Sequence, residues 1–186
     1  MEEAHTFAQE LSDILEKNKV VSKEEAQAMQ IAFKDSEQAQ FDDFLIEEGL
    51  VDQEDLLKAL SQYYQVPSFD VGGYFFDHFL ITKFPKGFLL REAVIPVGVE
   101  ENILSVVANN PSKEGLESAM REFVTYDITF MVGLRLPITD AVKEFYDKAP
   151  TQVKQDIDLR EERRLEAEAE EIEDSSELAV KLEEED

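Results

Sequence analysis

The side chains that most often perform chemistry are either absent from this sequence or scattered along it. His5 and His78 lie far apart, and neither has a second metal ligand at a suitable spacing. The chain has no cysteine, which excludes disulfides, thiolate nucleophiles and thiolate metal sites together. Carboxylate pairs such as Asp42–Asp43 and Glu47–Glu48 are uninformative about acid–base catalysis in a chain with 43 acidic residues. We therefore expect no metal, no cofactor and no enzymatic activity.

The sequence also contains no motif that would bind or hydrolyse a nucleoside triphosphate. The sequence contains no G-x-x-x-x-G-K-[ST] motif, so it lacks the loop and the lysine with which ATPases hold phosphates. The formal net charge is -25, which repels a nucleic-acid backbone or an anionic membrane. We expect no nucleic-acid partner and no direct membrane insertion.

The N-terminus is acidic where a signal peptide is basic, and no apolar run approaches the roughly 20 residues that span a bilayer. These features predict a cytoplasmic protein.

The N-terminal third contains one apolar pattern twice, thirty residues apart. Its positions correspond pairwise: Leu11, Ile14, Leu15, Val20 and Val21 to Phe41, Phe44, Leu45, Leu50 and Val51. The spacing predicts two helical hairpins within residues 7–66. Ser22 and Asp52 are expected as helix N-caps, each with an acid three residues later. Gly49 suits a left-handed helix C-terminus, and Lys19 holds the matching place in the first copy.

After Pro67 the apolar period changes from helical to strand-like. Runs at 93–99, 103–108 and 128–132 predict three strands, the first two as a hairpin. Helices are expected between the second and third strands and after Pro137. The predicted fold class is α+β: an N-terminal helical repeat, then a small three-stranded antiparallel sheet with helices on one face.

The chain is thus divided into three expected parts. These are a helical repeat subdomain (1–67), an α+β subdomain (68–147) and an acidic tail (148–186). The tail has no aromatic residue and few aliphatic ones, so it cannot bury much apolar area. Within it, residues 159–172 contain strong helix formers, and the last fourteen residues are expected to be disordered.

The order of these parts resembles one protein family. The segment that matters begins FDDFLIEEGLVDQEDLLKALSQYYQVPSFDV and continues with KFPKGFLLREAVIPVGVEENILSVVANNPSKEGLESAMREF. It resembles the N-terminal domain of type II secretion and type IV pilus assembly ATPases, the GspE/PilB N-terminal or MshEN-type domain. The family's Tyr-x-x-Pro is matched by Tyr64 to Pro67, and its strand ending in Ala-x-x-Pro by Ala108 to Pro111. The resemblance covers residues 7–147 and does not include the ATPase core.

Several members of this family bind cyclic di-GMP through the two repeat copies. By family position, the nucleotide-site candidates here are Leu11, Ser12, Leu15, Phe41, Asp42, Leu45 and Gly49. The family's Arg-Leu-Gly places hold Glu10-Leu11-Ser12 and Gln40-Phe41-Asp42, and its closing glutamines fall on Phe33 and Tyr63. Acids would therefore face the phosphates, so cyclic di-GMP is not expected to bind.

The resemblance implies a non-catalytic module that regulates, or interacts with, a type II secretion or type IV pilus-like system. In the family, this domain contacts a cytoplasmic part of the inner-membrane assembly machinery. The resemblance therefore implies a partner protein of that complex, which could recruit the chain to the inner membrane. The alternative is a cyclic di-GMP receptor with a divergent site.

Overall fold

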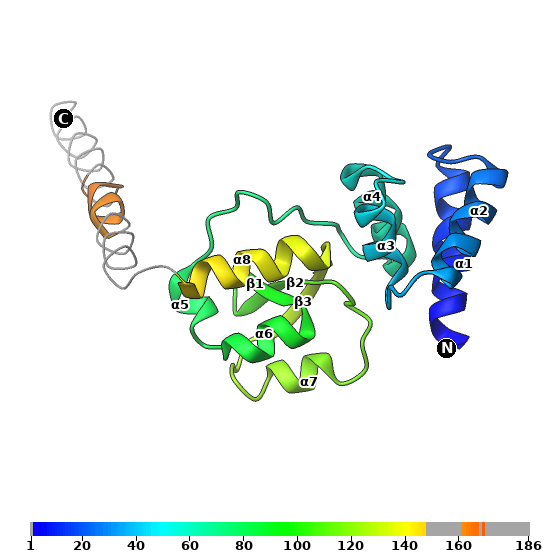
Figure 1. Ribbon diagram of the computed structural model, residues 1–186. Helices are drawn as coiled ribbons and strands as arrows, with labels where there is room; N and C mark the ends of the chain where they lie inside the picture. Colours follow the sequence, from blue (N-terminus) through cyan, green and yellow to red (C-terminus); the bar gives the residue numbers. More distant parts are fainter. Residues whose placement is uncertain (1, 148–160, 168, 170–186) are drawn as a thin grey trace, which may run out of the picture. The chain divides into compact units, whose positions relative to one another are not determined.

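The computed structural model describes residues 2–147, 161–167 and 169 (Figure 1). The chain forms two compact units, Met1–Tyr146 and Asp147–Asp186, and each is described by itself. In the second unit, residues 161–167 are helical and exposed, as the tail sequence predicts. The remainder of the expected tail helix, and the expected disordered end, lie outside the described residues. No helix in the described ranges is both long and apolar enough to cross a membrane.

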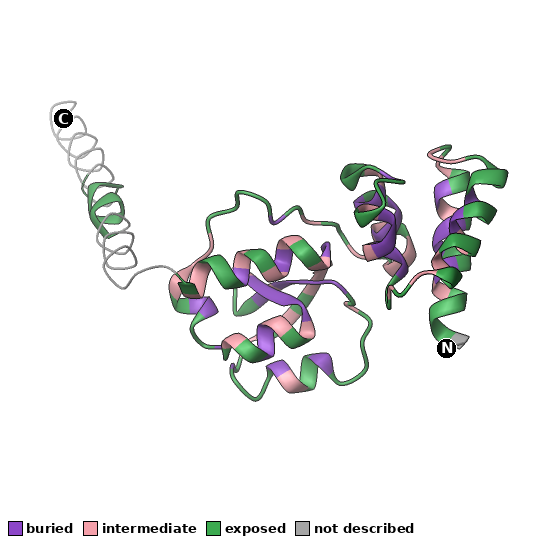
Figure 2. Ribbon diagram, viewed as in Figure 1, coloured by how far each residue is buried: buried purple, intermediate pink, exposed green. Residues whose placement is uncertain are grey.

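Four helices form the N-terminal half and confirm the two predicted hairpins. They are α1 (Glu2–Lys17), α2 (Lys23–Asp35), α3 (Phe41–Glu47) and α4 (Gln53–Tyr64). Helix α1 packs against both α2 and α4. The repeated apolar positions form the core between them, where the fully buried side chains include Leu11, Leu15, Phe41, Leu45, Leu56 and Leu60. Figure 2 shows these buried residues along the inner sides of the helices.

The helix ends follow the predicted signals, with one exception. Ser22 forms a complete capping box: its Oγ accepts from the Glu25 amide at 3.2 Å, and Glu25 Oε2 accepts from the Ser22 amide at 2.7 Å. Asp52 occupies the N-cap of α4 without a side-chain hydrogen bond. Lys19 and Gly49 both adopt the left-handed backbone conformation, with φ of 61° and 63°. Their matching places in the repeat predict this.

The two N-cap residues should therefore contribute different amounts to the free energy of unfolding. Replacing Ser22 with alanine removes a hydrogen bond and is expected to lower the free energy of unfolding by about 1 kcal/mol. The matched change Asp52→Ala removes only a charge near the helix dipole, about 0.5 kcal/mol. Urea denaturation followed by circular dichroism compares them. Equal losses in the two variants would contradict this account of the caps.

The C-terminal half contains the sheet. Its elements are α5 (His78–Ile81), α6 (Lys86–Glu92), β1 (Val94–Glu100), β2 (Ile103–Ala108), α7 (Leu116–Met120), β3 (Asp127–Val132) and α8 (Arg135–Asp147). The strand order is β1-β2-β3, and β1 pairs with β2 antiparallel as predicted. Glu101 and Asn102, with φ of 48° and 67°, form the tight turn between them. The α+β class is confirmed.

Two details of the sheet differ from the prediction. Strand β3 pairs with β2 in parallel, from Ile103 opposite Asp127 to Ala108 opposite Val132. The chain after β2 crosses back through α7 before it enters the sheet again, and such a crossover makes the next strand parallel. Consecutive residues of a strand point to opposite faces, yet Val106 and Val107 are both fully buried. Both faces of the sheet are therefore covered here, where helices were expected on one face only.

The end of β3 connects the two halves of this unit. The Val132 amide donates to Pro67 O, and the Phe69 amide donates to Val132 O, both at 2.9 Å. The segment after α4 thus runs beside β3. Val132 and Leu134 are buried in the helical core, whereas Ile138 is buried in the sheet core. Residues 132–138 consequently pass through the junction of the two cores.

Candidate functional site

A buried polar cluster lies at this junction. Asp42, near the start of α3, and Asn109, just after β2, are 3% and 4% exposed. Asn109 Nδ2 donates to Asp42 Oδ2 at 3.0 Å and to Gly133 O at 3.2 Å. Arg135 Nη2 donates to Asn109 Oδ1 at 3.1 Å. Asn109 therefore uses both ends of its amide to join α3, the end of β2 and the start of α8.

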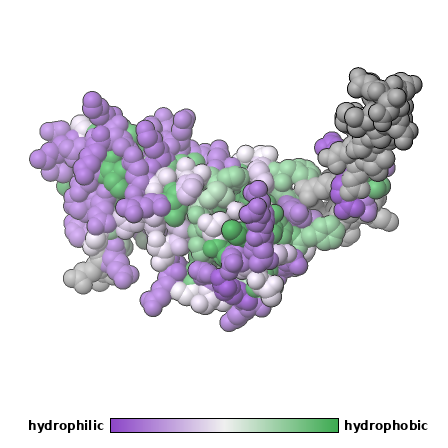
Figure 3. Space-filling model, turned by 180° about the vertical axis from the view of Figure 1, so that it is seen from behind, coloured by the Kyte–Doolittle hydropathy of each residue, from purple (hydrophilic) through white to green (hydrophobic). Residues whose placement is uncertain are grey.

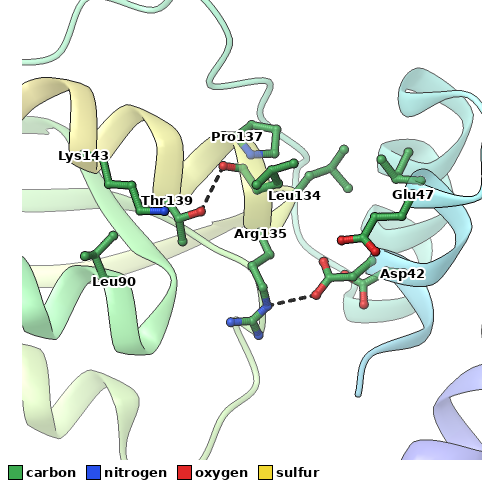
Figure 4. A pocket seen from close by; sticks show the side chains of 11 residues that line it. Asp42, Glu47, Leu90, Leu134, Arg135, Pro137, Thr139 and Lys143 are labelled. Carbon is green, nitrogen blue, oxygen red and sulfur yellow. Dashed lines mark hydrogen bonds and ion pairs between the residues drawn. The ribbon is translucent and has the colours of Figure 1, made fainter. Parts of the chain in front are cut away.

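Arg135 also pairs with the second acid of α3. Its Nε lies 3.2 Å from Asp43 Oδ2, an ion pair without the geometry of a hydrogen bond. Figure 4 shows the guanidinium extending from the start of α8 toward the carboxylates of α3. A small pocket of about 280 Å³ lies beside the pair, with mainly apolar walls from Ile46, Leu90, Leu134, Leu136 and Pro137. The cluster can therefore hold α3 against α8.

Burial governs the protonation of the two acids. Loss of water raises the pKa of Asp42, although Asn109 and Arg135 oppose the change. Burial and then the charge of Asp42 raise the pKa of Asp43 to about 6, and Arg135 again opposes this. A raised pKa means that the folded protein binds more protons than the unfolded chain between about pH 4 and 6. Stability from Asp43 is thus present at low pH and is lost as the pH rises through about 6.

The change Asp43→Asn should remove this dependence. Asparagine mimics the protonated acid, so at pH 7 the variant is expected to equal or exceed the wild type in free energy of unfolding, by about 1–2 kcal/mol at most. At pH 4 and below, the two proteins should have similar stability. Thermal melts from pH 4 to 8 measure the difference. A variant that is much less stable than the wild type at pH 7 would show that the ion pair with Arg135 outweighs burial.

A second, larger hollow lies on the helical half. This groove, of about 1090 Å³, is lined by one side of α1, the end of α4, residues 39–41 and the loop residues Asn110 and Ser112. Glu10 and Gln40, which stand at the two family arginine places, line it, as does Tyr63. Burial, followed by the charge of Glu10, raises the pKa of Tyr63. A carboxylate thus lines the groove at the position where the sequence resemblance implies an arginine.

The other nucleotide-site candidates lie mostly inside the protein. Leu11, Leu15, Phe41 and Leu45 are buried in the helical core, and Asp42 belongs to the junction cluster. The buried Ser12 Oγ donates to Ala8 O at 2.7 Å. Gly49 is exposed, with nothing within 4 Å of an added Cβ. Phe33, at a family glutamine place, packs its ring 5.2 Å from Phe41 and 5.5 Å from Phe44.

Asn109 and Arg135 are the members of the junction cluster that the sequence analysis missed. Asn109 stands in the strand-end segment on which the family resemblance rests, and that was an available signal. Nothing in the sequence distinguishes Arg135 from the other bases. Among the described residues there is no group of three or more His, Cys, Asp or Glu that could hold a metal.

The helical repeat, the small sheet and the cross-link between them define a two-part α+β domain of the kind found at the N-terminus of assembly ATPases. Residues 64–152 match the family model of the MshEN domain. The resemblance to GspE/PilB-type N-terminal domains is therefore confirmed. No curated protein sequence matches the chain significantly.

Two solved structures share the fold. The chain is 20% identical to MshE solved with cdg, with a TM-score of 0.59, over 73% of this chain and 98% of that one. It is 18% identical to the N-terminal domain of XpsE, with a TM-score of 0.53, over 72% of this chain and 91% of that one. At these identities the likeness establishes the fold.

Proposed function

We propose that this chain is a non-catalytic interaction and regulatory module of a type II secretion or type IV pilus-like system. In this role it docks onto a cytoplasmic part of the assembly machinery. The observation that carries the proposal is the MshEN segment at residues 64–152, set in a fold that aligns with 91% of the XpsE N-terminal domain. The division into subdomains 1–67 and 68–147 and a tail 148–186 is part of the proposal.

The junction cluster supports a docking role. Asn109 and Arg135 hydrogen-bond and pair with the acids of α3, so the helical hairpins and the sheet are held together from inside. A surface composed of both halves is then preorganised, and a partner does not have to order it on binding. Rigid presentation of a surface requires no catalytic residue.

The alternative is a cyclic di-GMP receptor with a divergent site. The support for this alternative is the structure of MshE, which was solved with that ligand. Against it, the groove at the family position is lined by Glu3, Glu10 and Asp13, with Lys17 as its one base among the described lining residues. These charges repel phosphates at short range. Docking of a protein therefore agrees better with the geometry.

Crosslinking in the host cell tests the proposal. The tagged full chain is expected to crosslink to a cytoplasmic domain of a secretion or pilus assembly protein, identified by mass spectrometry. The purified pair should then form a complex in sedimentation experiments. In parallel, calorimetry with cyclic di-GMP should show no saturable heat at micromolar ligand. Saturable binding there, together with no crosslink to any machine component, would favour the receptor instead.

A further inference from the structure

The groove on the helical half has an unusual combination of size, charge and aromatic rings. Its α1 side is a single stripe of residues that begins at Glu3 and ends at Lys17. At 1.5 Å per residue the stripe is about 21 Å long, the length of about six extended residues. The shape suits an elongated chain better than a compact small molecule.

The charges along the groove are mainly negative. Glu3, Glu10 and Asp13 contribute carboxylates from three different turns of α1, and Lys17 lies at one end. Figure 3 shows hydrophilic side chains over most of the N-terminal helices, at the left of the face drawn. The whole chain carries a formal charge of -25, so its field also attracts cations toward this surface.

Of the aromatic residues that line the groove, Phe7, Tyr63 and Tyr64 form a cluster of rings. The Phe7 ring lies 4.9 Å from Tyr63 and 6.3 Å from Tyr64, and the two tyrosine rings are 4.8 Å apart. Because aromatic faces are negative, such rings attract ammonium and guanidinium groups and repel phosphates. Glu10 lines the same groove as the rings, and its charge helps to raise the pKa of the Tyr63 hydroxyl after burial. Rings and carboxylates thus favour the same kind of ligand.

We infer that this groove binds a basic, partly apolar segment of a protein partner, with lysine or arginine side chains against Glu10, Asp13 and the aromatic rings. The inference rests on the proposed function and adds the place of docking and the chemistry of the partner. A second copy of this acidic chain would meet like-charge repulsion in the groove, as would an anionic nucleotide.

Peptide binding to the full chain tests the inference. The probe is an eight-residue peptide of alternating lysine and leucine with a neutral dye, measured by fluorescence anisotropy at 0.15 M salt. Saturable binding is expected, whereas the same peptide with glutamate in place of lysine should not bind. The double change Glu10→Lys with Asp13→Lys should weaken binding at least tenfold.

A matched variant separates the groove from the overall charge. Asp140→Lys with Glu144→Lys makes the same charge change on exposed positions of α8, and should weaken binding less than threefold. Tyr63→Leu keeps an apolar side chain but removes the ring, and should also weaken binding. Melting curves of each variant confirm folding. Equal losses in the two double variants would overturn the inference, because binding would then follow net charge alone.

The machine component identified by crosslinking provides the second readout. Its complex with the chain should be lost with Glu10→Lys and Asp13→Lys. If that complex persists in the groove variant, the inference is wrong while the proposed function stands. If the wild-type chain associates with no component, the proposed function fails, and the peptide measurement still reports on the groove.

Discussion

Replacing Asn109 with alanine is expected to lower the free energy of unfolding by about 3–5 kcal/mol, the largest effect of any single change considered. The amide hydrogen-bonds to Asp42, to Gly133 O and to Arg135, all at the junction of the two cores. Its removal leaves the carboxylate of Asp42 buried without that donor. A buried charge that loses its partner costs far more than the net value of the hydrogen bond.

The adjacent residue provides the control. Asn110 has the same side chain but is exposed, so Asn110→Ala should change the free energy by less than about 0.5 kcal/mol. Urea denaturation monitored by circular dichroism compares both variants with the wild type. Part of the loss from Asn109→Ala should be recovered at low pH, where Asp42 becomes protonated. Similar stabilities of the two variants would contradict a structural role for the cluster.

Replacing Gly133 with alanine is the second large change. An added Cβ would lie 2.5 Å from Val107 Cγ1, 3.2 Å from Ile138 Cδ1 and 3.3 Å from the backbone oxygen of Phe69. These neighbours belong to β2, α8 and the segment beside β3, so the methyl group cannot be accommodated by one side-chain rotation. Overpacking of this kind is expected to lower the free energy of unfolding by about 2–3 kcal/mol. Thermal denaturation at constant pH measures it.

Gly87 provides the opposite case for comparison. It lies in α6, and an added Cβ would have nothing within 4 Å. Gly87→Ala is therefore expected to leave stability unchanged or to raise it by up to about 1 kcal/mol, because alanine favours the helix. The two variants make the same chemical change, so their difference isolates the close approach at Gly133. A destabilised Gly87→Ala would indicate that glycine serves another purpose in this fold.

Much of the fold was predictable because the signals that specify it are local. The repeated apolar spacing marks four helices, since side chains three and four residues apart share one face of a helix. Ser22 with Glu25 marks a helix start in the same way, and the capping box forms as expected. The sequence also shows directly that Glu10 stands at a family arginine position and Asp42 at a family glycine position. Each of these features lies within a few consecutive residues.

The direction of β3 and the composition of the junction depended on the tertiary structure. Asp42 and Asn109 are 67 residues apart in the sequence and meet only because α3 and the end of β2 enter one junction. An aspartate in an amphipathic helix is normally exposed, so its pattern predicts solvent contact and not burial. The sequence alone therefore determined that the N-terminal third is helical, where the three strands lie, and that acids stand at the positions implied by the family resemblance. Which polar groups are buried together was decided by long-range packing, because burial depends on neighbours that no local pattern specifies.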